Sequence, residues 1–206
     1  MNRNAYTTAI LLAAGGSTRL GRPKQLLEWN GTTLLGSTIK SLGMAGCERL
    51  IVVLGAYESE IREHCVDGSN LPLETVINVD WSQGQATSLR AGIDRAIASE
   101  YRGATIIALC DQPLIDFGHY HKLAIQVSKF GAFAAATEYP EGPGVPACFS
   151  FSALQSLAIS VGDTGAKKWL REQPTHSLRL ITCPLAMLDI DTEFDYQEGM
   201  NLAQVV

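Results

Sequence analysis

The segment 11–24 joins a short apolar run to a glycine-rich loop that carries positive charge. It reads Leu-Leu-Ala-Ala-Gly-Gly-Ser-Thr-Arg-Leu-Gly-Arg-Pro-Lys, and its cations are Arg19, Arg22 and Lys24. Glycine lets backbone N–H groups converge on an anion without a Cβ in the way, so Gly15, Gly16 and Gly21 are expected to adopt positive φ angles. A plain strand-to-helix turn would explain the glycines, but not three cations and a hydroxyl within the eight residues 17–24. The segment therefore predicts a phosphate-binding loop.

Two better-known phosphate loops do not fit this segment. Gly16 and Gly21 have the spacing of a Walker A loop, but Arg-Pro-Lys follows where that loop requires Gly-Lys-Ser/Thr. A dinucleotide fingerprint is absent from the loop, because no two of its glycines are separated by one residue with a third at the required offset. Residues 12–24 instead resemble the signature Leu-Ala-(Ala/Gly)-Gly-x-Ser-x-Arg-(Met/Leu)-Gly-x-x-Lys of the MobA-like NTP-transferase family.

Further motifs, in the order found in this family, extend the resemblance over nearly the whole chain. They are Gln-Gly-Gln-Ala-Thr-Ser-Leu at 83–89, Cys-Asp-Gln-Pro-Leu at 110–114, Gly-Asp-Thr-Gly-Ala-Lys at 162–167 and Asp-Ile-Asp-Thr at 189–192. Within the family, the chain is most similar to the molybdenum cofactor cytidylyltransferases. The resemblance implies a three-layer α/β/α fold of the Rossmann-like nucleotidyltransferase type, with a mostly parallel sheet. It also implies Mg²⁺-dependent transfer of CMP from CTP to a phosphorylated acceptor, molybdopterin, with release of pyrophosphate.

The resemblance assigns roles to individual residues. Those expected to act in catalysis are Arg19, Lys24 and Asp111. Those expected to bind the nucleotide are Leu12, Ala13, Ala14, Gly15, Gly16, Ser17, Arg19, Gly21, Lys24, Asn78, Gln85, Ser88 and Asp111. Those expected to bind the acceptor are Gly144, Pro146, Gly162, Asp163, Gly165 and Lys167. Those expected to hold the metal are Asp111 and Asp191.

Lys24 and Asp111 also have purely structural interpretations. Lys24 could be a solvated surface lysine, and Asp111 could cap the helix that follows Pro113. Asp111 nevertheless ends an apolar run, where a carboxylate is costly unless something pairs with it. Magnesium takes one or two carboxylates together with phosphates and water, so Asp111 is the natural first ligand.

The second metal ligand and two polar residues leave alternatives open. Asp191 lies among several acids that can cap the last helix, and Asp189 stays open as the ligand in its place. Gln85 and Ser88 lie at the start of a predicted helix, so they either hydrogen-bond the nucleotide or cap that helix.

The acceptor motifs depart from those of the established cytidylyltransferases. Val145 stands where they carry Asn or His, and Lys167 replaces an arginine, which removes the bidentate fork that grips a phosphate. Another phosphorylated acceptor, such as a sugar phosphate, therefore stays open. So does a non-catalytic module that presents a cofactor to a partner, a molybdoenzyme or its chaperone. Ala14 stands where GTP-using members carry glycine, and its methyl would crowd the amino group of guanine, which favours CTP.

The composition limits the partners and the compartment. With 206 residues, 46% of them hydrophobic, one domain is expected over 1–206, with a nucleotide-binding half at about 1–138 and an acceptor-binding half at about 139–206. A formal charge of −5 argues against a nucleic-acid partner. Five scattered cysteines without a Cys-x-x-Cys pair suit reduced thiols in a cytoplasm. No apolar run has the roughly 20 residues that span a bilayer, so no membrane partner is expected.

Apolar runs of strand length alternate with stretches of helical spacing, which is typical of a parallel sheet with helices on both faces. Strands are expected at 9–13, 49–54, 74–78, 104–109 and 132–137. Helices are expected at 34–45, 59–64, 85–99, 117–128, 166–172 and 194–204. The Pro- and Gly-rich segment 139–146 is expected to be a loop. Because ligands bind beyond the carboxyl ends of parallel strands, the motifs that follow these strands are expected to meet in one crevice.

Overall fold

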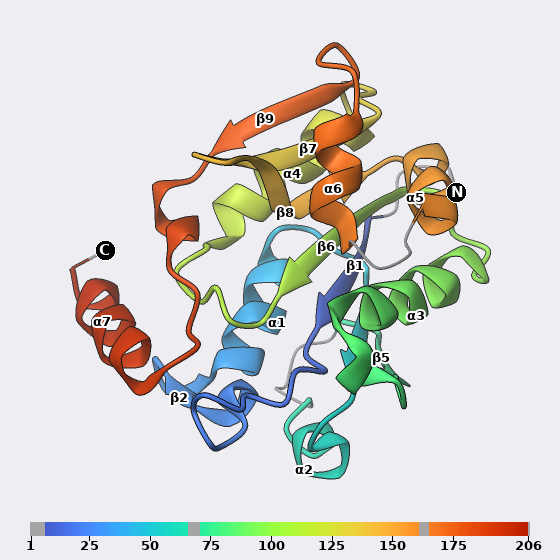
Figure 1. Ribbon diagram of the computed structural model, residues 1–206. Helices are drawn as coiled ribbons and strands as arrows, with labels where there is room; N and C mark the ends of the chain where they lie inside the picture. The colour runs from blue at the N-terminus through green and yellow to red at the C-terminus, as the bar shows by residue number, and fades with distance from the viewer. Residues whose placement is uncertain (1–6, 66–70, 161–164, 206) are drawn as a thin grey trace.

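The computed structural model describes residues 7–65, 71–160 and 165–205 (Figure 1), and a seven-stranded sheet forms its centre. In sheet order, the strands are β5 (Leu73–Ile77), β4 (Arg49–Leu54), β1 (Thr7–Leu12), β6 (Ala104–Leu109), β8 (Gly142–Phe149), β7 (Ala134–Tyr139) and β9 (Leu178–Thr182). β5, β4, β1 and β6 run parallel to one another, and β8 is antiparallel to both of its neighbours. A separate hairpin is formed by β2 (Glu28–Trp29) and β3 (Thr32–Thr33).

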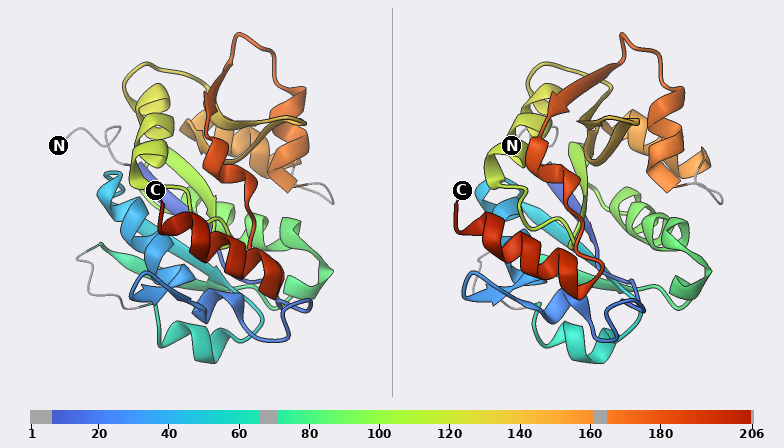
Figure 2. Two further views of the ribbon diagram at one scale, coloured as in Figure 1. Left: turned by 90° about the vertical axis from the view of Figure 1, so that its left-hand side faces the viewer. Right: turned by 60° about the vertical axis from the view of Figure 1, so that its left-hand side comes forward.

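Helices cover both faces of the sheet and make three layers (Figure 2). One face packs against α1 (Leu34–Met44), α2 (Glu58–Arg62) and α4 (Phe117–Ser128). The other face packs against α3 (Gln85–Ile97), α5 (Phe151–Ser160) and α6 (Gly165–Glu172). Neighbouring residues of β1 point to opposite layers, Leu11 toward α1 and Ile10 toward α3, which is why the strand is apolar without interruption. The predicted three-layer α/β/α fold with a mostly parallel sheet is confirmed.

A third apolar cluster attaches the C-terminal segment to the start of the chain. The helix α7 (Glu193–Ala203) packs beside the β2–β3 hairpin, where Trp29 and Ile190 are fully buried. This packing brings residues near 190 to the carboxyl edge of the sheet, next to residues that are distant from them in the sequence.

Among the described residues, no helix combines the length and the apolar character that a membrane span requires.

The prediction of a loop at 139–146 is wrong, because β7 and β8 form a hairpin across it. The prolines in this segment do not exclude a strand. Pro146 lies where the register between β7 and β8 shifts, so its missing N–H breaks no ladder hydrogen bond, and Pro143 lies beyond the stretch that pairs with β6. The helix α5, the edge strand β9 and the β2–β3 hairpin were not predicted either.

The buried His119 connects α4 to this hairpin. Its Nε2 lies 2.7 Å from Thr137 Oγ1, and that hydroxyl donates to the carbonyl of Pro146 at 2.7 Å. Since Thr137 uses its proton on Pro146, His119 Nε2–H is the donor in the first bond. His121 points elsewhere, toward the carbonyl of Ala45, so the two histidines do not form a metal site.

We expect protonation of His119 to destabilise the fold in acid. Burial lowers the pKa of His119 from 6.5 to about 4, so its contribution is complete above about pH 6.5 and is lost as the pH falls toward 4. The difference corresponds to about 3 kcal/mol of unfolding free energy. Urea unfolding over this pH range should show a smaller decrease for His119→Gln than for the wild type. Equal decreases would mean that other groups account for the acid sensitivity.

Candidate active site

The loop after β1 is held from beneath by a buried glutamine. Gln25 is 0% exposed, and its Nε2 donates to the carbonyls of Ala13 and Gly15 at 2.8 and 2.9 Å. The Ser17 hydroxyl accepts from the backbone N–H of Lys24 at 3.1 Å, which closes the loop. Gln25 was not among the predicted site residues, although it directly follows the signature lysine.

The predicted positive φ angles are right for one glycine of this loop and wrong for two. Gly21 has a φ of 73°, but it is Ser17, with a φ of 48°, and neither Gly15 nor Gly16, that takes the other left-handed position. Gly16 is needed for close approach, because a Cβ there would lie 2.9 Å from Cζ3 of Trp81. A Cβ on Gly15 would meet no atom within 4 Å.

Lys24 lies at the centre of the site and is paired with two carboxylates. Its Nζ donates to Asp111 Oδ2 and to Asp191 Oδ1, both at 2.7 Å, and the residue is only 9% exposed. Burial alone would lower the pKa of Lys24, but the charge and hydrogen bond of Asp111, with the bond to Asp191, raise that pKa above its ordinary value. The lysine is therefore a charged, buried group and not a solvated surface residue.

Neither aspartate of this cluster caps a helix. Asp116 caps α4 by accepting from the N–H of His119, and Thr192 with Asp195 forms the capping box of α7. Asp191 is free to pair with Lys24, and Arg19 donates to its Oδ2 at 2.7 Å. These cations keep the pKa of Asp191 below its ordinary value although burial acts to raise it. Asp111 Oδ1 is buried and has no hydrogen-bond partner.

A backbone hydrogen bond fixes the distance between the two aspartates. The N–H of Ile190 donates to the carbonyl of Asp111 at 2.8 Å, and the Ile190 side chain is buried in the cluster with Trp29. Asp191 follows directly, so its carboxylate is held beside that of Asp111 by the packing of α7.

Two cavities adjoin this cluster. The nucleotide cavity, of about 210 Å³, is lined by Leu12, Ala13, Ala14, Gly15, Lys24, Gln25, Trp81, Gln85, Ser88, Leu109, Cys110 and Asp111. The acceptor cavity, of about 330 Å³, lies between α3, β8, α6 and the turn Pro184–Met187. Both include Leu12, Gln85 and Leu109 in their walls, so they are neighbouring parts of one cleft. The smaller cavity is named after predicted nucleotide residues that line it, such as Lys24 and Asp111, and the larger one after the predicted acceptor residues Gly144, Gly165 and Lys167.

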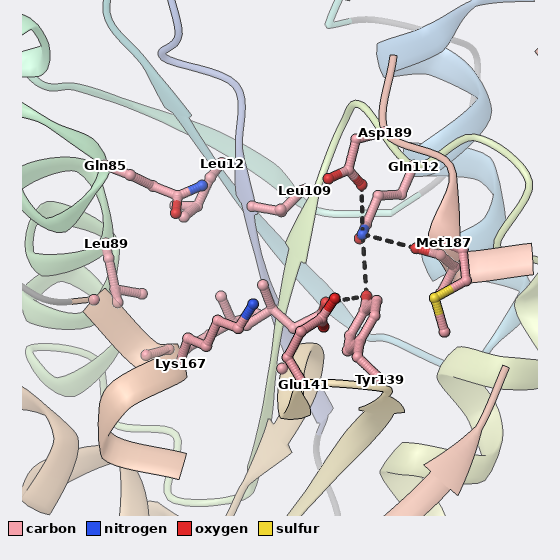
Figure 3. A pocket seen from close by; sticks show the side chains of 16 residues that line it. Leu12, Gln85, Leu89, Leu109, Gln112, Tyr139, Glu141, Lys167, Met187 and Asp189 are labelled. Carbon is pink, nitrogen blue, oxygen red and sulfur yellow. Dashed lines mark hydrogen bonds between the residues drawn. The ribbon is translucent and has the colours of Figure 1, made fainter. Parts of the chain in front are cut away.

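The wall of the acceptor cavity carries a hydrogen-bonded network centred on Gln112, which was not among the predicted site residues (Figure 3). Gln112 is 3% exposed, and its Nε2 donates to the Tyr139 hydroxyl at 3.1 Å and to Asp189 Oδ1 at 2.9 Å. Burial and the nearby charge of Asp111 raise the pKa of Asp189. Asp189 therefore belongs to the acceptor wall rather than to the lysine cluster. Gln112 lies in the Asp-Gln-Pro-Leu motif, and that motif was the available signal.

Of the remaining predicted nucleotide residues, Asn78 directly follows β5, and Gln85 and Ser88 lie at the start of α3. Asn78 donates from Nδ2 to Thr87 Oγ1 at 2.8 Å and to Ser88 Oγ at 2.9 Å, while its Oδ1 accepts from the N–H of Asp80. Ser88 is thus engaged by Asn78 and does not cap the helix, whose N-cap is Gly84. Gln85 lines both cavities.

The predicted acceptor residues are divided. Gly144, Gly165 and Lys167 line the acceptor cavity. A Cβ on Gly144 would lie 2.8 Å from Cε2 of Tyr139, so glycine allows that ring to approach. Pro146 is buried and lies outside the cavity lining. Gly162 and Asp163 lie outside the described residues.

Comparison with known proteins places these features in a family. Nicotine blue oxidoreductase of Paenarthrobacter nicotinovorans is 32% identical over 81% of this chain and 82% of its own. Molybdenum cofactor cytidylyltransferase of Escherichia coli is 27% identical over 91% of this chain and 92% of its own. Rv0371c of Mycobacterium tuberculosis, whose structure has also been solved in complex with manganese, superposes with a TM-score of 0.77 at 30% identity over 95% of this chain and 98% of its own.

The match to a family model covers most of the chain. The model for the MobA-like NTP transferase domain matches residues 9–177, which include the glycine-rich loop after β1 and the lining of both cavities except the segment 184–189. This chain belongs to the MobA-like NTP transferase family.

Proposed function

We propose that this protein transfers CMP from CTP to a phosphorylated acceptor of the molybdopterin class and releases pyrophosphate. The observation that supports the proposal most directly is the Lys24 cluster, in which two carboxylates share one ammonium at 2.7 Å on the wall of the nucleotide cavity. Nucleotidyl transfer brings two anions together, so the reaction needs fixed cations and little covalent chemistry. A site of this composition next to a second cavity suits that need.

The carboxylates of the cluster fit a divalent metal. Oxygen donors from two segments lie side by side, and Asp111 Oδ1 is buried without a partner. Mg²⁺ prefers one or two carboxylates and completes its coordination with phosphates and water, so the lack of a group of three acidic, His or Cys ligands among the described residues agrees with such a site. When bound, Mg²⁺ would neutralise charge on the phosphates. The manganese complex of Rv0371c supports a divalent metal here.

The protein's own groups have the following proposed roles. Lys24 and Arg19 stabilise charge that develops on the α-phosphate and on the departing pyrophosphate. The backbone N–H groups of 14–17 hold the triphosphate, on the side where Gly15 leaves open space. Lys167 attracts the phosphate of the acceptor, whose body lies against Gln112 and the apolar part of the acceptor wall. A molybdoenzyme or its chaperone would receive the product.

The direct test is pyrophosphate release. The purified protein is incubated with each NTP and Mg²⁺, with and without molybdopterin, and we expect release only with both substrates and fastest with CTP. Release with a sugar phosphate instead of molybdopterin would keep the reaction class and replace the acceptor. Binding of NTP with no release for any acceptor tested would favour a cofactor-presenting module.

We expect the preference for CTP over GTP to depend on Ala14. Ala14 and Trp81 line the nucleotide cavity. The methyl group of Ala14, which a glycine would lack, should disfavour a purine with an exocyclic amino group. Steric exclusion of this kind is worth about 10- to 200-fold. Calorimetric titration should show tighter binding of CTP by the wild type and a shift toward GTP in Ala14→Gly. Ala9→Gly is the matched control, because Ala9 lies on β1 in the opposite core layer and lines neither cavity. Tighter binding of GTP by the wild type would contradict the base assignment.

A second candidate follows from the similarity to nicotine blue oxidoreductase. The identity of 32% over 81% of the chain exceeds that to the cytidylyltransferase, and the acceptor cavity has an apolar wall that includes Leu89, Val145 and Met187. A planar heteroaromatic compound would suit such a wall. The discriminating measurement is oxidation of NADH or NADPH with a heteroaromatic dye, followed by nicotinamide absorbance. Oxidation without pyrophosphate release would replace the first candidate with this one.

A further inference from the structure

Three of the four carboxylate oxygens of Asp111 and Asp191 already accept hydrogen bonds from Lys24 or Arg19. Asp111 Oδ2 and Asp191 Oδ1 both accept from Lys24 Nζ, and Asp191 Oδ2 accepts from Arg19, each at 2.7 Å. Of the four carboxylate oxygens, Asp111 Oδ1 alone has no partner, and it is buried. The space between the two carboxylates is therefore occupied by the ammonium group of Lys24.

A metal ion that bridges the same carboxylates needs the position of this ammonium. Mg²⁺ takes oxygen ligands, so an ion held by both Asp111 and Asp191 would compete for carboxylate oxygens that now accept from Lys24 Nζ. Two cations cannot share this space, because their repulsion is strong in a partly buried site. Metal binding consequently requires Lys24 to give up its bonds to the carboxylates.

A triphosphate offers the ammonium a new partner. Lys24 lines the nucleotide cavity, and its backbone N–H is fixed by the Ser17 hydroxyl, so a change of side-chain rotamer is enough to turn Nζ from the carboxylates toward a phosphate. Phosphate oxygens accept charge-assisted hydrogen bonds as carboxylates do. Arg19, whose side chain is 69% exposed, can follow the same anion.

We propose that Lys24 is a resident counterion that makes divalent-metal binding at Asp111 and Asp191 conditional on the nucleotide. The inference rests on the proposed function only in assuming that a triphosphate binds in the nucleotide cavity. Nucleotide and metal then bind with positive coupling, and by linkage each raises the affinity of the other by the same factor. In the absence of nucleotide, the ammonium of Lys24 competes with divalent metal ions for the two carboxylates and keeps their negative charges paired.

The test measures Mn²⁺ affinity without turnover. Free Mn²⁺ is followed by electron paramagnetic resonance during titration into the full-length protein without nucleotide. We expect weak binding by the wild type and binding about 30-fold tighter by Lys24→Met, the middle of the usual range of coupling free energies. Lys40→Met, the same change at an exposed lysine on α1, should match the wild type. Adding Asp111→Asn to Lys24→Met should abolish the gain.

If Lys24→Met binds Mn²⁺ no more tightly than the wild type, the lysine does not compete with the metal and the inference fails. Lys24→Gln, which keeps an N–H donor, repeats the measurement if thermal melting shows that the methionine variant is unfolded. A wild type that releases no pyrophosphate would refute the proposed function, but the difference in Mn²⁺ affinity between the wild type and Lys24→Met would still be readable.

Discussion

Asp111→Asn is expected to abolish nucleotidyl transfer while weakening NTP binding only moderately. The amide keeps the size of the carboxylate but loses the charge that pairs with Lys24 and would hold the metal. Loss of an electrostatic contact that acts on transition-state charge commonly costs about 10²- to 10³-fold in kcat, and loss of the metal itself costs more. Pyrophosphate release under saturating CTP and Mg²⁺ measures the effect.

Asp116→Asn is the matched control for this variant. Asp116 lies five residues further along the chain and caps α4 by accepting from the N–H of His119 at 2.9 Å. Asparagine caps helices about as well as aspartate, so stability and turnover should stay near the wild-type values. Metal-dependent activity of Asp111→Asn within tenfold of the wild type would remove Asp111 from the mechanism.

Lys24→Ala is expected to lower kcat by about 10²-fold or more, because its ammonium is a buried cation on the wall of the nucleotide cavity. This loss has a different cause from that in Asp111→Asn. Without the ammonium the two carboxylates should bind Mn²⁺ more tightly, so a higher metal concentration should not restore turnover. Single-turnover rates over a range of Mg²⁺ concentrations separate the two variants.

An unchanged rate in Lys24→Ala would mean that the lysine pairs with the aspartates for stability alone. Lys24→Arg adds a second comparison, since it keeps the charge but replaces a compact ammonium by a planar fork. We expect partial activity from it if charge is what matters. Lys40→Ala should leave the rate unchanged, because Lys40 is exposed on α1, away from both cavities.

Much of the fold could be predicted from the sequence because burial on both faces leaves a local signal. The central strands β4 and β6 and the helix α4 have the predicted bounds, since each apolar run or periodic stretch is set by the layers around it. The strand β8 could not be predicted, because its two prolines are tolerated only through details of strand pairing. Pro146 lies at a register shift against β7, and Pro143 lies outside the stretch that pairs with β6. Strand pairing of this kind leaves no signal in the composition of the segment 139–146.

For the candidate active site, too, one part could be predicted from the sequence and another part depends on the tertiary structure. The sequence alone determined that a cationic glycine loop and Asp111 each follow a strand of a parallel sheet, and strand direction then brings them to one edge of that sheet. The structure added that the two strands, β1 and β6, are direct neighbours. Only the tertiary structure decided which acid near the C-terminus joins them. Asp191 pairs with Lys24 across 167 residues, Asp195 caps α7 and Asp189 faces the acceptor cavity. These three carboxylates are equivalent in type and close in sequence, so their roles depend on the packing of Ile190 and α7 against the β2–β3 hairpin, which fixes where each one points.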